Sequence, residues 1–269
     1  RQQDMFYDAV AEGREDTVDR LIDKVDVDKV DESSGFTPLM IAAKRGRVEM
    51  VRKLLDYGAD INRTTRYGLR WSSLHMACHY SHAAVVEELL TNDDLDTNLC
   101  LSNCCSRQSF SGASPLMLVA RNGNHEILQK LLAAGAEIDA VTNKYESSLY
   151  YASKAGHAFV VDILLSKGAD VNLETTDSVS PLMAAAFEGH KRIVRKLLLM
   201  RARVPTYELT KPGAKMSLAD IWKMKREIEA IEDTDDEEFP VCAPLCSCKW
   251  CEGPSSSDDD DDDDDDDDC

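Results

Sequence analysis

Two clusters of histidine and cysteine are the residues of this 269-residue chain whose types and spacing suit metal binding. The first has the pattern H-x-x-C-H-x-x-H and consists of His75, Cys78, His79 and His82. The second consists of Cys242, Cys246, Cys248 and Cys251. Four thiolates so close together could bind one Zn²⁺ tetrahedrally, but structural zinc sites usually contain two well-spaced pairs. An unoccupied segment is therefore the favoured interpretation, with zinc and then lipidated cysteines as the alternatives.

Motifs for catalysis are missing from the sequence. It contains no Gly-rich phosphate loop after a strand, no G-x-S-x-G and no H-E-x-x-H. We therefore expect a protein that is not an enzyme and uses no cofactor. Nine cysteines, an odd number, without an export signal favour a reducing, intracellular compartment, cytoplasmic or nuclear. Arg1 stands where a start methionine would, which suggests a fragment or a trimmed start.

Charge divides the sequence into two parts. Residues 233–269 contain 17 acidic residues and one lysine, a net charge of −16, whereas residues 1–232 carry only −3 of the total −19. The like-charged run cannot pack against itself, so this tail is predicted to be disordered. The overall negative charge disfavours nucleic acid as a partner. Apolar runs far shorter than about 20 residues give no reason to expect a membrane span.

A repeated motif organises about residues 4–204. Thr37, Ser114, Ser147 and Ser180 each open a copy of the form T/S-P/S-L-φ-x-x-x-x-x-G, followed by a Leu-Leu pair. A fifth copy lacks the Pro and the Gly, and a degenerate sixth opens the chain. The apolar anchors are Phe6, Leu39, Leu74, Leu116, Leu149 and Leu182, at spacings of 33, 35, 42, 33 and 33 residues.

The residue types explain how each unit would fold. Thr37 or Ser180 can accept a backbone N–H bond at a helix start, and Pro38 fits the first turn, where no N–H is needed. Gly46 can take the left-handed conformation that ends a short helix. A second apolar helix follows and ends at Gly58, after which the chain turns outward. One unit cannot bury both faces, so stacking must form the core.

This pattern resembles the ankyrin repeat, in both its T-P-L-H-x-A motif and its 33-residue period. The resemblance implies an all-α repeat solenoid of stacked helix-turn-helix units with β-hairpin fingers. It also accounts for most of the histidine cluster, since His75 and His82 stand at the usual histidine positions. Only His79 is left unexplained, which disfavours a metal site there.

The expected organisation has four parts. Residues 1–33 form a degenerate N-terminal capping repeat, and residues 34–204 form the repeats. Ser217 and Asp220 can form a capping box that opens a C-terminal capping helix within residues 205–232, with a free amphipathic helix as the alternative. Residues 233–269 form the disordered Cys/Asp-rich tail. The repeat boundaries are about 34–66, 69–99, 111–143, 144–176 and 177–204.

The resemblance also implies a binding surface on the concave face. Its exposed positions are the residue after the His position and the two before the Gly, and a short insertion ending at Trp71 adds interface-type side chains. The expected binding residues are Ile41, Lys44, Arg45, Arg66, Tyr67, Arg70, Trp71, Met76, His79, Tyr80, Leu118, Arg121, Asn122, Tyr151, Lys154 and Phe187. This basic and aromatic stripe favours an acidic or phosphorylated protein segment as ligand, and ordinary solvated positions are the alternative.

We therefore expect a monomeric protein-interaction adaptor or scaffold. One alternative is that the acidic tail carries a basic protein such as a histone. A weaker alternative is a substrate recruiter for a ubiquitin ligase or kinase. Two further expectations follow: the tail competes for the basic stripe of its own body, and, from the resemblance, an asparaginyl hydroxylase modifies Asn62 and Asn172.

Overall fold

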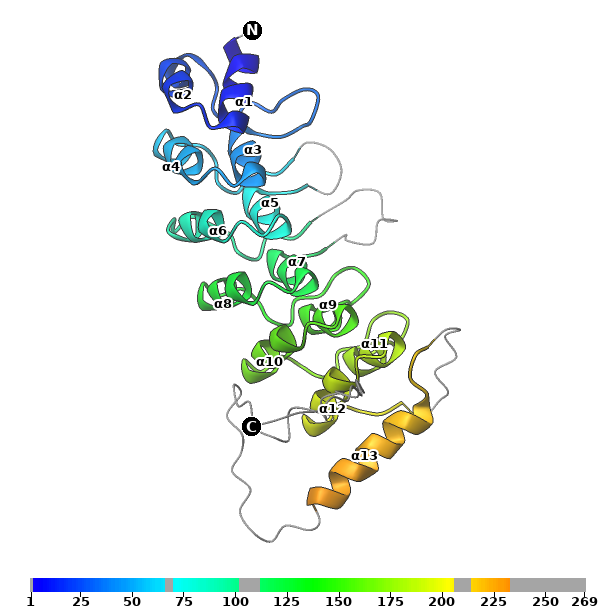
Figure 1. The fold of residues 1–269 in the computed structure, drawn as a ribbon. Helices are drawn as coiled ribbons and strands as arrows, with labels where there is room; N and C mark the ends of the chain where they lie inside the picture. Colours follow the sequence, from blue (N-terminus) through cyan, green and yellow to red (C-terminus); the bar gives the residue numbers. More distant parts are fainter. Residues whose placement is uncertain (1, 66–69, 102–111, 206–213, 233–269) are drawn as a thin grey trace, which may run out of the picture.

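The computed structural model describes residues 2–65, 70–101, 112–205 and 214–232 as a stack of helix pairs (Figure 1). The first helix of each pair lies on one side of the stack, and these inner helices are α1 (Gln2–Glu12), α3 (Pro38–Arg45), α5 (Ser73–His79), α7 (Pro115–Asn122), α9 (Ser148–Ala155) and α11 (Pro181–Glu188). The outer helices are α2 (Glu15–Leu21), α4 (Val48–Asp56), α6 (Ala83–Leu90), α8 (His125–Ala133), α10 (Ala158–Ser166) and α12 (Lys191–Leu199). A 3-10 turn, η1 (Ile22–Lys24), extends α2, and α13 (Leu218–Glu232) follows the last pair.

The predicted helix starts and ends are confirmed. The hydroxyl oxygens of Thr37 and Ser180 each accept a hydrogen bond of 3.3 Å from the backbone N–H three residues later. Gly46 and Gly123 follow their helices with φ of 71° and 79°, the left-handed region that glycine adopts without steric cost. The inner helices after α1 are seven or eight residues long, and all of them except α5 end at a glycine, whereas α5 ends at Tyr80.

The stack has one continuous apolar core that runs from α1 to α13. All six predicted anchors are at most 1% exposed: Phe6, Leu39, Leu74, Leu116, Leu149 and Leu182. Small residues such as Ala42 and Ala43 are also fully buried, which lets neighbouring inner helices approach closely. The predicted register of the core is confirmed.

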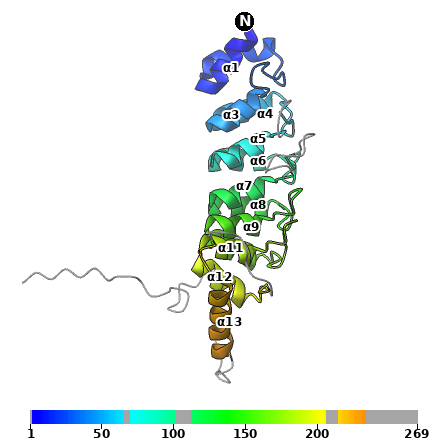
Figure 2. The same cartoon turned by 90° about the vertical axis from the view of Figure 1, so that its right-hand side faces the viewer.

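The loops between repeats project to one side of the stack (Figure 2). The expected β-hairpins are reduced here to two isolated antiparallel bridges, Thr64 with Ser72 and Val141 with Ser147, and the described residues form no strand. The turns explain the difference. Thr142 N–H donates to the carbonyl of Glu146 at 3.1 Å, so the chain reverses within a few residues and leaves no length for a ladder.

Histidines link consecutive repeats through backbone carbonyls. The Nε2 atom of His157 lies 2.9 Å from the carbonyl oxygen of Arg121, one repeat earlier, and His82 and His190 make the same contact with Lys44 and Lys154. Each ring lies directly over the glycine that ends the preceding inner helix. These glycines therefore serve two purposes: they adopt positive φ, and they leave room for the ring.

Gly123→Ala tests this double role. A Cβ at this position would lie 2.5 Å from Nδ1 of His157, in addition to the positive φ of 79°. We expect the substitution to lower the free energy of unfolding by about 2 kcal/mol, measured by urea unfolding. The control is Gly135→Ala, with φ of 84° but no heavy atom within 4 Å, which should cost only about 1 kcal/mol. Equal losses would show that His157 moves aside freely.

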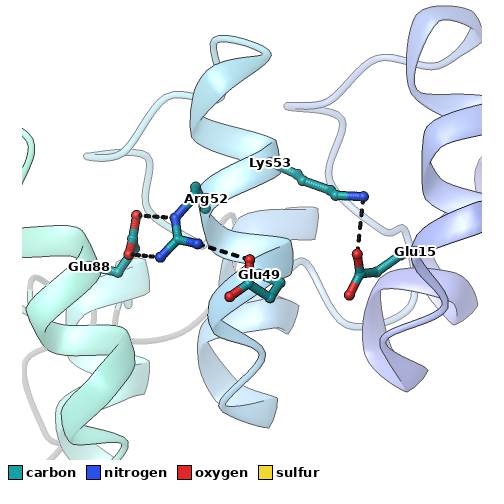
Figure 3. Close-up of polar contacts among 5 residues, drawn as sticks. All are labelled: Glu15, Glu49, Arg52, Lys53 and Glu88. Carbon is teal, nitrogen blue, oxygen red and sulfur yellow. Dashed lines mark hydrogen bonds and ion pairs between the residues drawn. The ribbon is translucent and has the colours of Figure 1, made fainter.

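Ion pairs connect the outer helices across the repeat boundaries (Figure 3). Arg52 on α4 donates two hydrogen bonds, of 3.1 and 2.7 Å, to the carboxylate of Glu88 on α6, and a third to Glu49 on its own helix. On the other side of α4, Lys53 lies 3.3 Å from Glu15 on α2. These exposed pairs align charges along the stack and contribute little to stability.

The last helix begins at the predicted capping box. The hydroxyl and backbone N–H of Ser217 donate to Oδ2 of Asp220 at 2.7 and 3.0 Å, and the N–H of Asp220 donates back at 3.2 Å. Ile221 and Ile228 are buried, and they join the core beside α12. Trp222, on the same helix, is exposed. In the parts of the chain that the structure describes, no helix has the length and apolarity to cross a membrane.

Candidate binding surface

The inner helices and the loops that precede them form one surface, which we call the inner surface. It contains a basic pocket of about 410 Å³, which lies between the inner helices and a loop. Helices α7, α9 and α11 and the loop before α9 contribute the lining residues Arg121, Lys144, Glu146, Tyr151, Lys154, Ala155 and Glu188. Three cations from three separate segments therefore converge on one pocket.

Each of the two carboxylates of this pocket contacts another side chain. The hydroxyl of Tyr151 donates a hydrogen bond of 2.6 Å to Oε2 of Glu146. Burial and, after it, this hydrogen bond raise the pKa of Tyr151, so the phenol stays protonated and keeps Glu146 in place. Glu188 lies 3.8 Å from Nζ of Lys215. The pocket therefore has a surplus of positive charge for an acidic ligand.

Aromatic side chains follow one another across the middle of the inner surface. The rings of Trp71 and His79 lie 5.2 Å apart, edge to face, and His79 contacts Tyr80 at 5.0 Å. Lys44 places its Nζ 5.0 Å from the ring centroid of Phe36 and 5.8 Å from that of Tyr80. Partial burial, and then the charge of Arg121, lower the pKa of His79, so its ring is neutral at pH 7.

A second pocket, of about 330 Å³, lies at the N-terminal end of the inner surface. Its lining includes the cations Lys44 and Arg45 and the carboxylates of Asp4, Asp8 and Asp31. Hydrogen bonds from the side chains of Ser33 and Ser34 lower the pKa of Asp31 to about 2, so this carboxylate stays ionised. The expected stripe is therefore basic in its middle and mixed in charge at this end.

Four of the expected binding residues are buried rather than exposed. The residues after the His position, Met76, Leu118 and Tyr151, are covered, and so is Phe187 near the end of α11. Ala184, the matching position of the last repeat, is buried as well. Leu118, Tyr151 and Ala184 belong to a second apolar cluster that includes loop residues Leu101 and Ala113. The loops fold over these positions, which the repeat pattern alone does not reveal.

The remaining expected residues occupy the surface or its margin. Arg45, His79, Tyr80, Arg121, Asn122 and Lys154 are exposed, and Ile41, Lys44 and Trp71 are half-buried. Arg70 is exposed, with φ of 52°, and its Nε donates to the hydroxyl oxygen of Thr64 at 3.1 Å. Arg66 and Tyr67 lie outside the described residues. Asn122 donates to the carbonyl of His79 at 2.9 Å and thus links two repeats.

The histidines and the cysteine of the first cluster, on α5 and just after it, each make separate contacts. His75 is buried, with Nδ1 2.7 Å from the hydroxyl of Ser72, and His82 contacts the backbone of the preceding repeat. Burial raises the pKa of Cys78, which makes its thiol inert as a metal ligand. The four cysteines Cys242, Cys246, Cys248 and Cys251 lie outside the described residues, as does the whole acidic tail.

The two asparagines expected to be hydroxylated occupy equivalent turns. The amide of Asn62 donates to the carbonyl of Asp94 at 2.6 Å, and its oxygen accepts from the N–H of Asp96 at 2.8 Å. The oxygen of Asn172 accepts from the N–H of Arg203 at 2.9 Å. Both side chains therefore hold the turn of the following repeat. Their hydroxylation stays a prediction.

Sequence reasoning missed three loop residues of the candidate site. Lys144 and Glu146 line the basic pocket, and Phe36 contacts Lys44, yet none of the three was among the expected residues. A usable signal was present. Phe36 and Glu146 each lie three residues before their anchors, Leu39 and Leu149, so this offset recurs in the period.

Comparison with known proteins gives a consistent result. The family model for ankyrin repeats, which describes three copies, matches residues 6–100 and 116–207. Putative E3 ubiquitin-protein ligase XBAT31 of Arabidopsis thaliana is 33% identical over 114 residues, which is 41% of this chain and 25% of that protein. Human ankyrin repeat and SOCS box protein 3 is 30% identical over 110 residues, 41% of this chain and 20% of that protein.

The similarity extends to proteins with very different names. Human transient receptor potential cation channel subfamily A member 1 is 30% identical over 127 residues, 47% of this chain and 10% of that protein. The chain thus spans a quarter or less of these relatives, so what they share with it is the repeated unit. The matched ranges coincide with the stacked helix pairs described above, and the chain belongs to the ankyrin-repeat family.

Proposed function

We propose that this chain is a non-enzymatic adaptor that binds another protein through its inner surface. Ankyrin repeats are protein-interaction modules, and the extended face of a solenoid offers many contact points along one partner. The proposed ligand is an acidic or phosphorylated segment. The observation that carries the proposal is the pocket in which Arg121, Lys144 and Lys154 converge from three segments.

The chemistry of this pocket suits carboxylates and phosphates. A guanidinium group can bind either anion through two parallel hydrogen bonds, and ammonium groups add charge without strict geometry. The neighbouring aromatic strip, from Trp71 to Tyr80, offers apolar contact beside the charges. A peptide that combines acidic and apolar residues would therefore match the inner surface better than an acidic stretch alone.

The test is a pair of charge reversals on the full chain. Lys144→Glu with Lys154→Glu reverses two cations of the pocket, and Lys24→Glu with Lys167→Glu reverses two exposed cations away from the inner surface. Binding of fluorescein-labelled Glu-rich and phosphoserine peptides is measured by anisotropy. We expect the pocket variant to lose at least tenfold in affinity and the control to lose less than twofold. Equal affinities in all three proteins would refute the proposal.

The two alternative functions, histone carrier and substrate recruiter, predict different experimental results. A histone carrier that works through residues 233–269 would bind histone equally well in both charge-reversal variants. A substrate recruiter for a ubiquitin ligase draws support from two relatives, whose names include an E3 ubiquitin-protein ligase and a SOCS box protein. Capture of ligase subunits by the full chain would favour recruitment over simple scaffolding.

A further inference from the structure

Four of the ion pairs that join consecutive outer helices follow a rule. Numbered from the first residue of each outer helix, the fifth residue pairs with the sixth residue of the next outer helix, and the two charges are opposite. The pairs are Asp19 with Lys53, Arg52 with Glu88, Glu87 with Lys130, and Asp162 with Lys196. At the remaining boundary the same positions hold Gln129 and Ile163, which are both uncharged. We call each ion pair that follows this rule a rung, and a charged position without its partner an open rung.

The rule leaves one rung open at the C-terminal end of the stack. Arg195 is the fifth residue of α12, and the described residues that follow α12 form no further outer helix. The next helix, α13, packs beside α12 through Ile221 and Ile228, but Arg195 stays exposed and has no ion-pair partner among the residues that the structure describes. By the rule, the missing partner is a carboxylate.

The open rung is part of a larger basic face. On α12 the exposed side chains of Lys191, Arg192 and Leu199 surround that of Arg195, since each of them lies three or four residues from it along the helix. Lys191 also acts on α13: hydrogen bonds from Ser217, and then the charges of Lys191 and Lys223, lower the pKa of Asp220. Residues 191–226 contain eleven lysines and arginines and only two acidic residues.

The strongest source of carboxylates in this protein begins immediately after α13. Residues 233–269 carry a net charge of −16, including eleven consecutive aspartates, Asp258–Asp268. Some 25 residues separate α13 from this run, and an extended chain of that length spans about 80 Å, far more than the roughly 22 Å of α13 itself. The tether keeps the aspartates near millimolar effective concentration.

We propose that the acidic tail, residues 233–269, docks on the basic face of α12 and that its aspartates complete the rung left open by Arg195. Charge distribution favours this face over the inner surface. The pockets of the inner surface contain carboxylates of their own, such as Asp8, Glu146 and Glu188, which weaken the attraction of these pockets for the tail. The exposed side of α12 contains none.

The docked tail has two consequences for the protein. It covers a strongly basic end of the stack, so that nucleic acids and other polyanions are excluded from it. It also leaves the inner surface open, so a partner of the proposed function need not displace the tail. The proposal therefore does not depend on the inner surface being a binding site.

The test compares the full chain with a full-length variant in which all eleven residues Asp258–Asp268 are changed to Asn. Amide chemical shifts are recorded by ¹⁵N-¹H correlation spectra at about 0.02 M and 0.5 M salt. At low salt we expect differences between the two proteins that concentrate on Lys191–Arg203. At 0.5 M salt these differences should fall at least fivefold, because the screening length drops well below 10 Å.

Matched substitutions identify the face. Arg192→Glu with Arg195→Glu in the full chain should remove the tail-dependent shifts, whereas Lys44→Glu with Lys154→Glu on the inner surface should leave them unchanged. All four side chains reach the surface, and far-ultraviolet circular dichroism verifies that each variant is folded. Tail-dependent shifts on α3 and α9 instead of α12 would overturn the proposal in favour of the sequence-based expectation that the tail competes for the inner surface. No tail-dependent shift anywhere would also overturn it.

Discussion

Replacing Leu149 with alanine is expected to lower the free energy of unfolding by about 2–5 kcal/mol. Leu149 is the anchor of the fifth helix pair and is only 1% exposed, so the substitution leaves a cavity in the middle of the stack. Helix α9 packs against both α7 and α11, and each repeat is stabilised by its neighbours. The loss should therefore extend beyond the mutated repeat.

Urea unfolding followed by circular dichroism measures this loss. The matched control is Leu199→Ala, since Leu199 is 51% exposed at the end of α12 and its truncation should cost less than about 0.5 kcal/mol. A second substitution, Leu182→Ala, probes the equivalent anchor of the next repeat and should behave like Leu149→Ala. A loss near zero at both anchors would mean that the core register described here is wrong.

The second large effect is a loss of stability on mild acidification, caused by His75. This side chain is 0% exposed, and its burial lowers its pKa to about 4, against about 6.5 in an unfolded chain. Between these values the unfolded chain binds one more proton than the folded protein does. The contribution of neutral His75 is therefore complete above pH 6.5 and is lost as the pH falls towards 4, by about 3 kcal/mol in total.

The slope of stability against pH isolates this effect from the cost of the substitution itself. His75→Gln should flatten the dependence between pH 7 and pH 4, whatever its stability at neutral pH, whereas His125→Gln, at an exposed position on α8, should not. Asp31, with its pKa of about 2, loses its contribution only at still lower pH. If NMR titration showed His75 protonating near pH 6.5 in the folded protein, this explanation would be wrong.

Much of the fold follows from local sequence. Thr37, Pro38 and Gly46 start and end an inner helix by their own backbone preferences, and the same residue types recur in other copies. The 33-residue spacing of the leucine anchors then requires a stack, because a single helix pair leaves an apolar face uncovered. The capping box at Ser217 was also visible in the sequence, since it involves residues only three apart.

The candidate site was predictable only in part. The repeat period placed Lys44, Arg121 and Lys154 on the inner helices, but it gave no reason to expect that Leu118 and Tyr151 would be buried. Their burial depends on loop residues such as Leu101, which come from a different repeat. The period also gave no reason to expect Lys144, a loop residue that completes the basic pocket.

The sequence by itself determined which residues start, end and anchor each helix, because these properties depend on neighbours along the chain and on a fixed period. It also determined the separation of charge between the body and the tail. Only the tertiary structure decided which charges meet. The rungs join residues 34 to 43 positions apart. Arg195 has no such partner because, among the described residues, α12 is the last outer helix. Such pairings depend on how repeats are stacked in space, which no local preference specifies.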